Sequence, residues 1–192
     1  MVHAKLLSAT QNPMVLLKTA AGECYQKEAT DKVIDHIVKA GHLSVLEHCY
    51  ATFEVTCSIT TLMQLTRHRH LSFTVQSSRV CHMDSVHHVD NLDIDVAIDK
   101  AMDNYHLLIA KGHSVEEAAY VLPKATEYKL VVTGNFRAWF EYLPKRLCKR
   151  ASKEHRELAE LILHALRANC PEVFLKCETP CATCKEEGCY FA

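Results

Sequence analysis

Residues 50–57, YATFEVTC, alternate between apolar and polar side chains at every position. Ala51, Phe53, Val55 and Cys57 fall on one side of an extended chain, because successive side chains of a strand point to opposite faces. The stretch therefore predicts a strand with one buried face and a polar face that carries Glu54. A second stretch, TEYKLVVTG at 126–134, also predicts a strand through its β-branched residues.

The other periodic segments have helical spacing of their apolar residues. The predicted helices cover residues 31–40, 59–68, 92–111, about 137–146 and about 152–169. Ser44 with Glu47, and Ser114 with Glu117, have the spacing of a capping box and predict two further helix starts. The helix at 59–68 would carry Gln64, Arg67 and His68 along one edge. Residues 71–79 lack helix signals and predict an extended segment, from which Ser77 and Arg79 point the same way.

Size and composition indicate one folded unit with no long linker. A chain of 192 residues can bury a substantial core, and five Gly and five Pro leave little material for loops. The 22 basic and 23 acidic side chains nearly cancel, and no aromatic platform accompanies the basic run, so we expect no nucleic-acid partner. No apolar run approaches a membrane span, and the N-terminus lacks the pattern of a signal peptide. We expect a cytoplasmic protein with reduced cysteines, most of them buried except for the four in the C-terminal tail.

The stretch RHRHLSFTVQSSR at 67–79 places Arg67, His68, Arg69 and His70 in succession, followed by hydroxyl and amide residues and then Arg79. Guanidinium groups bind phosphate and carboxylate oxygens through paired, charge-assisted hydrogen bonds. Such a run suits the pyrophosphate of a flavin or nicotinamide cofactor. Taken alone, it also fits a solvated helix end whose cations complement the helix dipole.

The sequence resembles the flavin-dependent thymidylate synthase family in several segments that occur in order from about residue 20 to 175. RHR is followed after seven residues by Ser77, and Arg79 lies two positions further, as in that family. The matching segments are GHLSVLEHCYATFEV, QLTRHR, VLPKATEYKLVVTGNFRAWFEYLPKR and NCPEVF. The resemblance implies a single-domain α+β fold with a central, mostly antiparallel sheet flanked by helices. Its limits would be residues 1–175, followed by a cysteine-rich tail at 176–192.

The resemblance also implies a role for each matching residue. The FAD-binding set would be Ser44, Arg67, His68, Arg69, Asn135 and Arg137. The set that binds dUMP would be Gln64, Arg67, Ser77, Arg79 and Arg146. The candidate catalytic residues are Arg146, which would face the uracil and favour its deprotonated form, and Ser77. No His-Asp pair stands in a fixed relation to Ser77, which favours a substrate contact over a nucleophile.

The implied reaction is the reductive methylation of dUMP to dTMP. Methylene-tetrahydrofolate would donate the one-carbon group, and FAD reduced by NADPH would supply the hydride, so the cofactor performs the hard chemistry. No nucleophilic cysteine is required, and none of the ten has the Pro-Cys-His context of the unrelated class of thymidylate synthase. The family is homotetrameric with active sites shared between subunits, which we expect here as well.

Three positions depart from the family pattern. Val75 replaces a common Glu, Ala119 replaces a common Arg that helps to bind the nucleotide phosphate, and AAGECY alters an early segment. Losing one charge-assisted contact costs roughly 1.5–3 kcal/mol. Cations that could replace the phosphate contact are Lys124, Lys145, Lys149 and Arg150. Two alternatives remain: a flavoprotein for another pyrimidine nucleotide such as UMP or dCMP, and a non-catalytic nucleotide- or metal-binding homologue.

The tail CETPCATCKEEGC holds Cys177, Cys181, Cys184 and Cys189 within thirteen residues. Four thiolates can close a structural zinc site, and the CATC pair has the gap that such sites use. A zinc ribbon would have two such pairs, whereas this tail has one. The alternatives are a structural zinc ion that tethers the C-terminus and a tail with free thiols.

Overall fold

The structure is a computed structural model that describes residues 2–24, 26–177, 181, 184–185 and 189–190. The strands are β1 (His3–Ala9), β2 (Tyr50–Ser58), β3 (Ser72–Val75) and β4 (Glu127–Asn135). The helices are α1 (Pro13–Glu23), α2 (Asp31–Lys39), α3 (Ile59–Leu65), α4 (Leu92–Ala110), α5 (Val115–Ala118), α6 (Phe136–Leu147), α7 (Lys153–Asn169) and α8 (Pro171–Phe174). Two 3₁₀ helices, η1 (Leu43–His48) and η2 (Ala119–Val121), complete the described elements.

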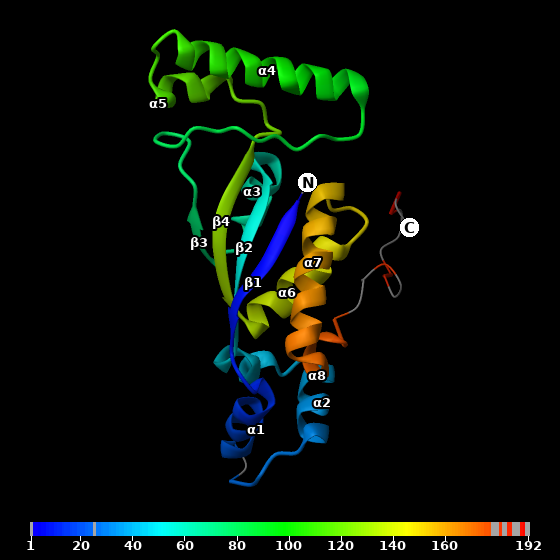
Figure 1. The fold of residues 1–192 in the computed structure, drawn as a ribbon. Helices are drawn as coiled ribbons and strands as arrows, with labels where there is room; N and C mark the ends of the chain where they lie inside the picture. The colour runs from blue at the N-terminus through cyan, green and yellow to red at the C-terminus, as the bar shows by residue number, and fades with distance from the viewer. Residues whose placement is uncertain (1, 25, 178–180, 182–183, 186–188, 191–192) are drawn as a thin grey trace.

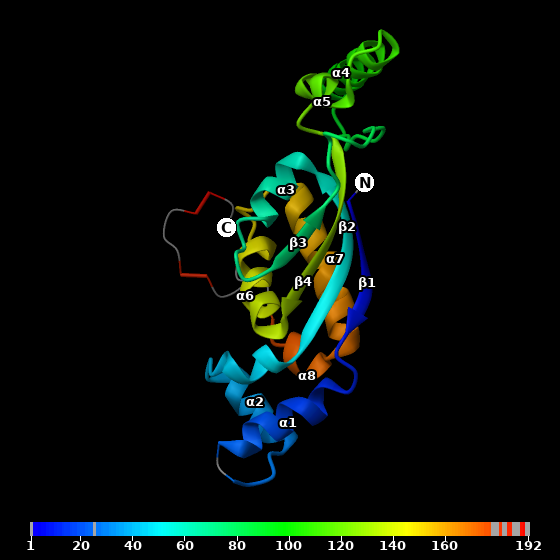
Figure 2. The same ribbon diagram turned by 90° about the vertical axis from the view of Figure 1, so that its left-hand side faces the viewer.

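The four strands form one antiparallel sheet in the order β1-β2-β4-β3. Figures 1 and 2 show that the molecule is elongated, with α4 and α5 beyond one end of the sheet and α1 and α2 beyond the other. Helices α6 and α7 cover one face of the sheet (Figure 2). This arrangement confirms the predicted α+β fold with an antiparallel sheet.

The alternation in β2 has the predicted effect on burial. Ala51, Phe53, Val55 and Cys57 are fully buried, whereas Glu54 on the opposite face is exposed. The buried face of the sheet packs against α6. There the ring of Trp139 contacts the ring of Phe53 edge-on, with 5.2 Å between the ring centroids. The removal of such apolar side chains from water is the main driving force for folding.

Trp139 also fixes α6 to the sheet through a polar contact. Its Nε1 donates to the carbonyl oxygen of Ala51 at 3.1 Å. Gly134 lies beside this indole, and a Cβ atom at that position would collide with the side chain of Leu71. Glycine therefore allows the close approach of the segment before β3 to β4, and a larger residue here would have to displace the Leu71 side chain. Together these contacts set the position of α6, which carries Arg137 and Arg146.

Several predicted elements are confirmed with small changes of boundary. The helices predicted at 31–40, 92–111, 137–146 and 152–169 correspond to α2, α4, α6 and α7. The capping box at Ser114 and Glu117 is formed in α5, with both reciprocal hydrogen bonds present. The predicted turn near Ser44 exists as η1, but its N-cap is His42 and no capping box forms there.

The predictions for residues 59–79 are confirmed in part, since a helix followed by an edge strand is present, but the bounds of both elements differ. Helix α3 ends at Leu65 rather than near His68, because the chain turns there to enter the edge strand β3. Extended structure ends at Val75, and the backbone N–H groups of Val80 and Cys81 both donate to the carbonyl oxygen of Ser77 in a turn. The common direction predicted for Ser77 and Arg79 therefore has no strand to support it.

Before residue 31, where the periodicity of the sequence predicts no element, the structure has β1 and α1. Strand β1 contains an irregularity between Leu6 and Ser8 in its pairing with β2, which breaks the alternation that identifies a strand. Helix α1 begins with Pro13 after Asn12 in the left-handed conformation. Tyr25, in the altered early family segment, lies outside the described residues.

Within the described ranges, no helix combines the length and apolar character needed to cross a bilayer.

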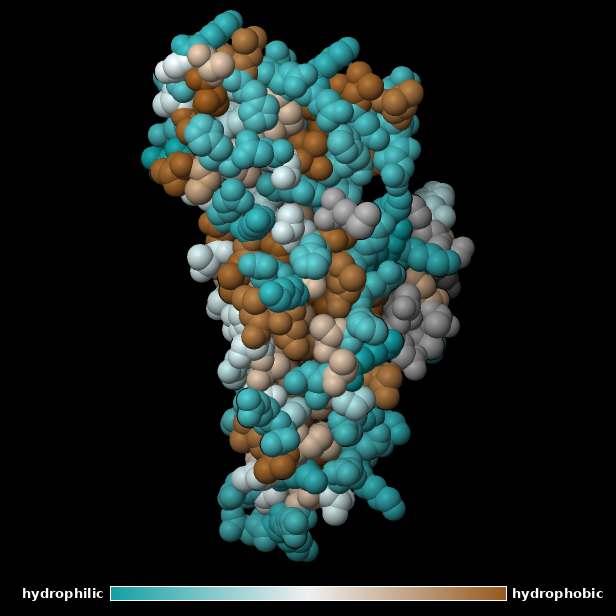
Figure 3. Space-filling view, viewed as in Figure 1, coloured by the Kyte–Doolittle hydropathy of each residue, from teal (hydrophilic) through white to brown (hydrophobic). Residues whose placement is uncertain are grey.

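Figure 3 shows apolar side chains gathered over the middle of the view and interspersed among the polar residues at the end where α4 lies. The large exposed apolar side chains of α4 are Leu92, Ile94, Val96 and Leu107.

Candidate functional site

Three elements bring their polar side chains together beside the C-terminal end of α3. Arg146, near the end of α6, donates from Nε to His68 Nε2 at 2.8 Å and from its NH2 group to the carbonyl oxygen of Gln64 at 3.2 Å. His155 of α7 lies on the other side of Gln64, with its Nδ1 3.3 Å from Gln64 Oε1. Three residues predicted as site residues, Gln64, His68 and Arg146, are therefore in one hydrogen-bonded group.

Burial makes both histidines of this group neutral near pH 7. Burial, followed by the charges of Arg146 and Lys145, lowers the pKa of His68 to about 4. Burial also lowers the pKa of His155 to about 3, with Arg146 and His68 adding to the effect. A neutral His68 can accept the hydrogen bond that Arg146 donates. The charge of the RHR run therefore lies on its arginines, which corrects the interpretation of His68 as one of the cations.

Burial lowers the pKa of Arg146 from its ordinary value. An arginine nevertheless remains protonated at physiological pH. Its Nε and one NH2 group are engaged with α3 and with the segment that follows α3. These contacts hold a half-buried positive charge in a fixed orientation, which is the property needed to stabilise an anionic ring beside it.

Arg67 and Arg69 lie in the turn after α3 and are exposed. Among the described residues neither side chain has a hydrogen-bond or ion-pair partner. Because α3 ends at Leu65, Arg67 does not continue its polar edge as predicted. Both guanidinium groups are available to an anion from outside the chain, such as a pyrophosphate.

A second polar group surrounds the first turn of α6. Asn135 caps this helix, since its Oδ1 accepts from the backbone N–H of Ala138 at 2.8 Å. The NH1 group of Arg137 donates to Glu47 Oε1 at 2.6 Å, and its Nε donates to Glu141 Oε1 at 2.9 Å. Glu47 thus pairs with Arg137 rather than capping η1.

A cavity of about 270 Å³ lies next to these residues. Its lining consists of Glu47, His70, Asn135, Arg137, Ala138 and Glu141. Ser44, predicted in the same FAD-binding set, is exposed within η1. The two carboxylates hold Arg137 at the rim of the cavity, and together they exceed its single positive charge.

Ser77 and Arg79 form a third, separate location. Both are exposed, and the backbone N–H of Arg79 donates to Ser77 Oγ at 3.3 Å. The Arg79 guanidinium pairs with Glu116 of α5 at 2.8 Å. Ala119, where the family has an arginine, follows directly after α5. Within the described part of the chain, no hydrogen bond or ion pair joins this pair to Arg146 or Gln64.

The described residues fit an anionic cofactor of the FAD type in one respect. Two arginines without internal partners, Arg67 and Arg69, follow α3, and a cavity bordered by Arg137 and Asn135 lies at the start of α6. A pyrophosphate needs several guanidinium donors, and these residues supply them. The cavity, at about 270 Å³, lies near the lower end of the volume range typical of ligand pockets, roughly 300–1,000 Å³.

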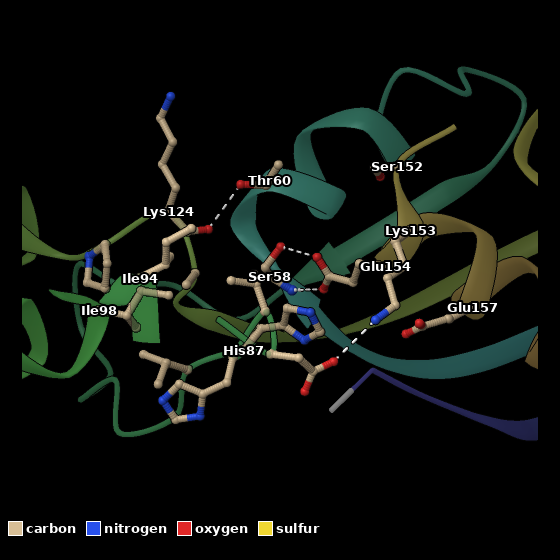
Figure 4. A pocket seen from close by; sticks show the side chains of 16 residues that line it. Ser58, Thr60, His87, Ile94, Ile98, Lys124, Ser152, Lys153, Glu154 and Glu157 are labelled. Atoms are coloured by element: carbon tan, nitrogen blue, oxygen red, sulfur yellow. Dashed lines mark hydrogen bonds and ion pairs between the residues drawn. The ribbon is translucent and has the colours of Figure 1, made fainter. Parts of the chain in front are cut away.

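Another cavity, larger than the one beside Arg137, lies between α4, the start of α7 and the segment before β4 and has a volume of about 940 Å³ (Figure 4). At its wall the Glu154 carboxylate accepts hydrogen bonds from the backbone N–H and the Oγ of Ser58. His87 Nδ1 and Ser152 Oγ, which belong to residues lining this cavity, are buried without a hydrogen-bond partner among the described residues. Lys124, one of the cations considered for the nucleotide phosphate, lines it, whereas no residue of the predicted FAD-binding and dUMP-binding sets does.

The cysteines differ from the prediction that most of those outside the tail are buried. Three of these six, Cys49, Cys57 and Cys170, are buried, and so is Cys177 of the tail. Burial raises the pKa of the Cys57, Cys170 and Cys177 thiols to about 12, so these are structural groups rather than nucleophiles. In the described part of the tail, Cys177, Cys181, Cys184 and Cys189 do not form a group that could hold a metal ion.

Three residues of the site region, Tyr142, Glu154 and His155, are absent from the sets predicted from the sequence. Tyr142 is one of several aromatic residues in α6, and its sequence context resembles that of any core residue. The pair Glu154-His155 does give a signal, because both side chains are polar at positions on the buried face of an amphipathic helix.

Comparison with known proteins gives the family of this chain. Residues 5–172 match the family described as "Thymidylate synthase complementing protein". Curated relatives are named flavin-dependent thymidylate synthases. The chain belongs to this flavin-dependent thymidylate synthase family.

The similarity extends over nearly the whole chain. The relative from Corynebacterium diphtheriae is 32% identical over 93% of this chain and 84% of its own length. The one from Mycobacterium tuberculosis is 35% identical over 83% and 77%, and the one from Geobacter sulfurreducens is 31% identical over 95% and 90%.

A solved structure, Thymidylate Synthase X from Helicobacter pylori with FAD and dUMP, superposes with a TM-score of 0.83. It covers 92% of this chain and 99% of its own, at 24% sequence identity. This likeness establishes the same fold.

Proposed function

We propose that this protein is a flavin-dependent thymidylate synthase that methylates dUMP reductively to dTMP. Its family membership supports this function, and so does the gathering of Gln64, His68 and Arg146 from separate elements into one group. The observation that carries the proposal is the orientation of Arg146, a half-buried cation fixed by His68 and by the carbonyl oxygen of Gln64. A cation held beside a uracil ring favours its deprotonated form.

The other roles follow the family pattern. FAD, when bound, carries the hydride that completes the methyl group. Arg67, His68, Arg69, Ser44, Asn135 and Arg137 would hold it, with Arg67 and Arg69 on its phosphates. Gln64, Ser77 and Arg79 would bind the nucleotide. NADPH as reductant, methylene-tetrahydrofolate as one-carbon donor and a cytoplasmic location are parts of the same proposal.

We further propose a homotetramer whose active sites each use residues of more than one subunit. Three observations support it. Ser77 and Arg79 are separate from Arg146 within one chain, and the small cavity beside Arg137 leaves room for a second chain to complete it. The exposed apolar residues of α4 also provide area for subunit contacts, because monomers rarely expose large apolar patches.

Another pyrimidine nucleotide, such as UMP or dCMP, is the second candidate substrate. It is favoured by Ala119, which leaves no guanidinium at that position after α5, and by the ion pair that occupies Arg79 with Glu116. The missing guanidinium at Ala119 would also be consistent with a non-catalytic homologue that binds a nucleotide without converting it. Lys124, Lys145, Lys149 or Arg150 would supply the missing phosphate contact in an active enzyme.

The test is to purify the protein, measure its FAD content and follow bleaching of the flavin by NADPH. Methylene-tetrahydrofolate and dUMP, UMP or dCMP are then added, and the nucleotide products are separated by chromatography. Formation of dTMP from dUMP supports the synthase. A methylated product only from UMP or dCMP would reassign the substrate, and bound nucleotide without product would indicate a binding protein.

The proposed zinc ion at Cys177, Cys181, Cys184 and Cys189 is a separate question, which elemental analysis of the purified protein answers. One zinc per chain that is lost when Cys181 and Cys184 are both replaced by serine would support the tether. Metal-free protein would favour the tail with free thiols.

A further inference from the structure

Helix α7 presents two consecutive polar side chains to α3, and both are buried. The exposed fraction is 9% for Glu154 and 0% for His155. Glu154 accepts hydrogen bonds from Ser58 and Thr61, at the start of α3, and His155 contacts Gln64, near its end. Residues 58, 61 and 64 are three apart and share one side of α3. Helix α7 therefore contacts that side at both ends.

The contacts of His155 leave neither ring nitrogen without a partner. Its Nδ1 lies 3.3 Å from Gln64 Oε1, and its Nε2 lies 3.2 Å from the hydroxyl group of Tyr142. A carboxamide oxygen can only accept, so Nδ1 donates to it, and Nε2 accepts from Tyr142. A neutral imidazole has this combination of one donor and one acceptor. The low pKa of about 3 keeps the ring in that form at neutral pH.

Tyr142 extends the same network to the other side of the site. Its ring contacts the ring of His68 edge-on, with 4.8 Å between centroids, and Tyr142 is itself buried. His68 in turn accepts from Arg146. His155 and Tyr142 thus lie beneath Gln64 and Arg146, the two residues proposed to contact the nucleotide. Both His155 and Tyr142 are themselves buried.

We propose that His155 is a positioning residue, which with Tyr142 holds the Gln64 side chain in one rotamer with its amide nitrogen free for the nucleotide. The carboxamide oxygen is occupied by His155, so the NH₂ group is the end left for a ligand. The NH₂ group is a donor, and it selects an acceptor on the substrate, such as a carbonyl or phosphate oxygen. This inference rests on the proposed function in assigning Gln64 to nucleotide binding.

The first test is a set of variants measured for dUMP affinity and for turnover. His155→Phe removes both ring nitrogens, Tyr142→Phe removes only the hydroxyl group, and His155→Gln restores a donor and an acceptor. We expect His155→Phe to raise the KM for dUMP about tenfold, the effect of one lost hydrogen bond, with a smaller change in kcat. We expect His155→Gln to recover most of the affinity. FAD content and Tm serve as controls for folding.

A double-mutant cycle with Gln64→Ala separates positioning from general destabilisation. If His155 acts through Gln64, His155→Phe weakens dUMP binding in the wild-type background and adds little in the Gln64→Ala background. Equal losses in both backgrounds would overturn the proposal, as would a loss of FAD and thermal stability that accounts for the whole effect. The Tyr142→Phe variant, which preserves volume, gives the same comparison if His155→Phe does not fold.

A measurement without nucleotide keeps this proposal separate from the proposed function. The side-chain NH₂ resonances of Gln64 can be assigned by comparison with Gln64→Ala. We expect them to be single and sharp in the wild type and shifted or broadened in His155→Phe. Unchanged resonances would overturn the positioning role even if dTMP forms. If the resonances change but the protein does not bind dUMP, the contact between His155 and Gln64 is supported and the proposed function is rejected.

Discussion

Individual residues of the site differ in charge from what their types suggest. His68 lies between two arginines in the sequence, yet burial and Arg146 hold its pKa at about 4, so it acts as a hydrogen-bond acceptor. Arg67 and Arg69, on either side, are exposed cations. The sequence predicts the cluster of side chains, because the motif is local. It could not predict the charge of His68, which depends on Arg146, a residue 78 positions away.

The role of Arg69 in cofactor binding is tested by Arg69→Ala. Because its guanidinium has no described internal partner, its loss should leave the fold intact while weakening FAD binding by about one to two decades. FAD per subunit is read from absorbance after gel filtration, and folding from circular dichroism. Lys100→Ala, which removes an exposed positive charge on α4, is the control. A variant that retains stoichiometric FAD would rule out the assigned role.

Acid should destabilise the protein through its two neutral histidines. The pKa values of His68 and His155 are lowered in the folded state from 6.5 to about 4 and about 3. The unfolded chain therefore binds more protons below pH 6.5, and the free energy of unfolding falls as pH decreases toward 4. Each histidine contributes a slope of at most about 1.4 kcal/mol per pH unit.

Denaturant unfolding at several pH values measures this slope. His155→Phe should unfold with a smaller pH dependence than the wild type between pH 6.5 and 4, since one titrating group is gone. Identical slopes for the two proteins would show that His155 is not neutral and buried as described.

At the scale of elements, local patterns predict the strands and helices well where burial follows a period. The alternation in β2 and the capping box of α5 illustrate this. The pattern is insufficient where tertiary contacts decide, as at the end of α3, which is set by the entry into β3, and in β1, where the pairing shift interrupts the period. The site cluster between α3, α6 and α7 combines residues from 64 to 155, and no local pattern contains that information.

Glu154 tests the contact between α7 and α3. Its carboxylate accepts three hydrogen bonds, from Ser58 N–H at 2.7 Å, Ser58 Oγ at 2.5 Å and Thr61 Oγ1 at 2.7 Å. Glu154→Gln keeps the size but puts an NH₂ group opposite a donor and removes the charge that strengthens these bonds. We expect a loss of about 3 kcal/mol in the free energy of unfolding.

The control for Glu154→Gln is Glu160→Gln, an exposed position on the same helix. Surface substitutions of this kind usually change stability by less than about 0.5 kcal/mol. Urea unfolding at pH 7 gives both values. Equal stability of the two variants would mean that the buried carboxylate does not hold α3 to α7.

For the whole molecule, the distribution of site residues matters more than any single contact. One chain places Arg146 with Gln64 and places Arg79 with Glu116 of α5, and the described contacts do not join the two groups. The family resemblance predicts a shared site, which cannot be derived from the sequence of one chain by periodicity or spacing. Association between copies would bring the two groups together.

Sharing of sites predicts complementation between inactive variants. Arg79→Ala and Arg146→Ala should each lose turnover. When the two are unfolded together and refolded as a mixture, about a quarter of the sites in a randomly mixed tetramer should receive both intact residues. The recovered rate is measured against wild-type protein treated in the same way. A mixture as inactive as its components, despite the formation of tetramers, would place both residues in sites within one subunit.

The most direct test of the central claim is release of tritium from dUMP labelled at carbon 5. The purified protein is incubated with FAD, NADPH and methylene-tetrahydrofolate, and tritiated water and dTMP are measured in the same samples. We predict that the wild type releases tritium and forms dTMP together, and that Arg146→Ala retains its flavin but releases neither. Oxidation of NADPH by the bound flavin without tritium release would contradict the assignment of this chain as a thymidylate synthase.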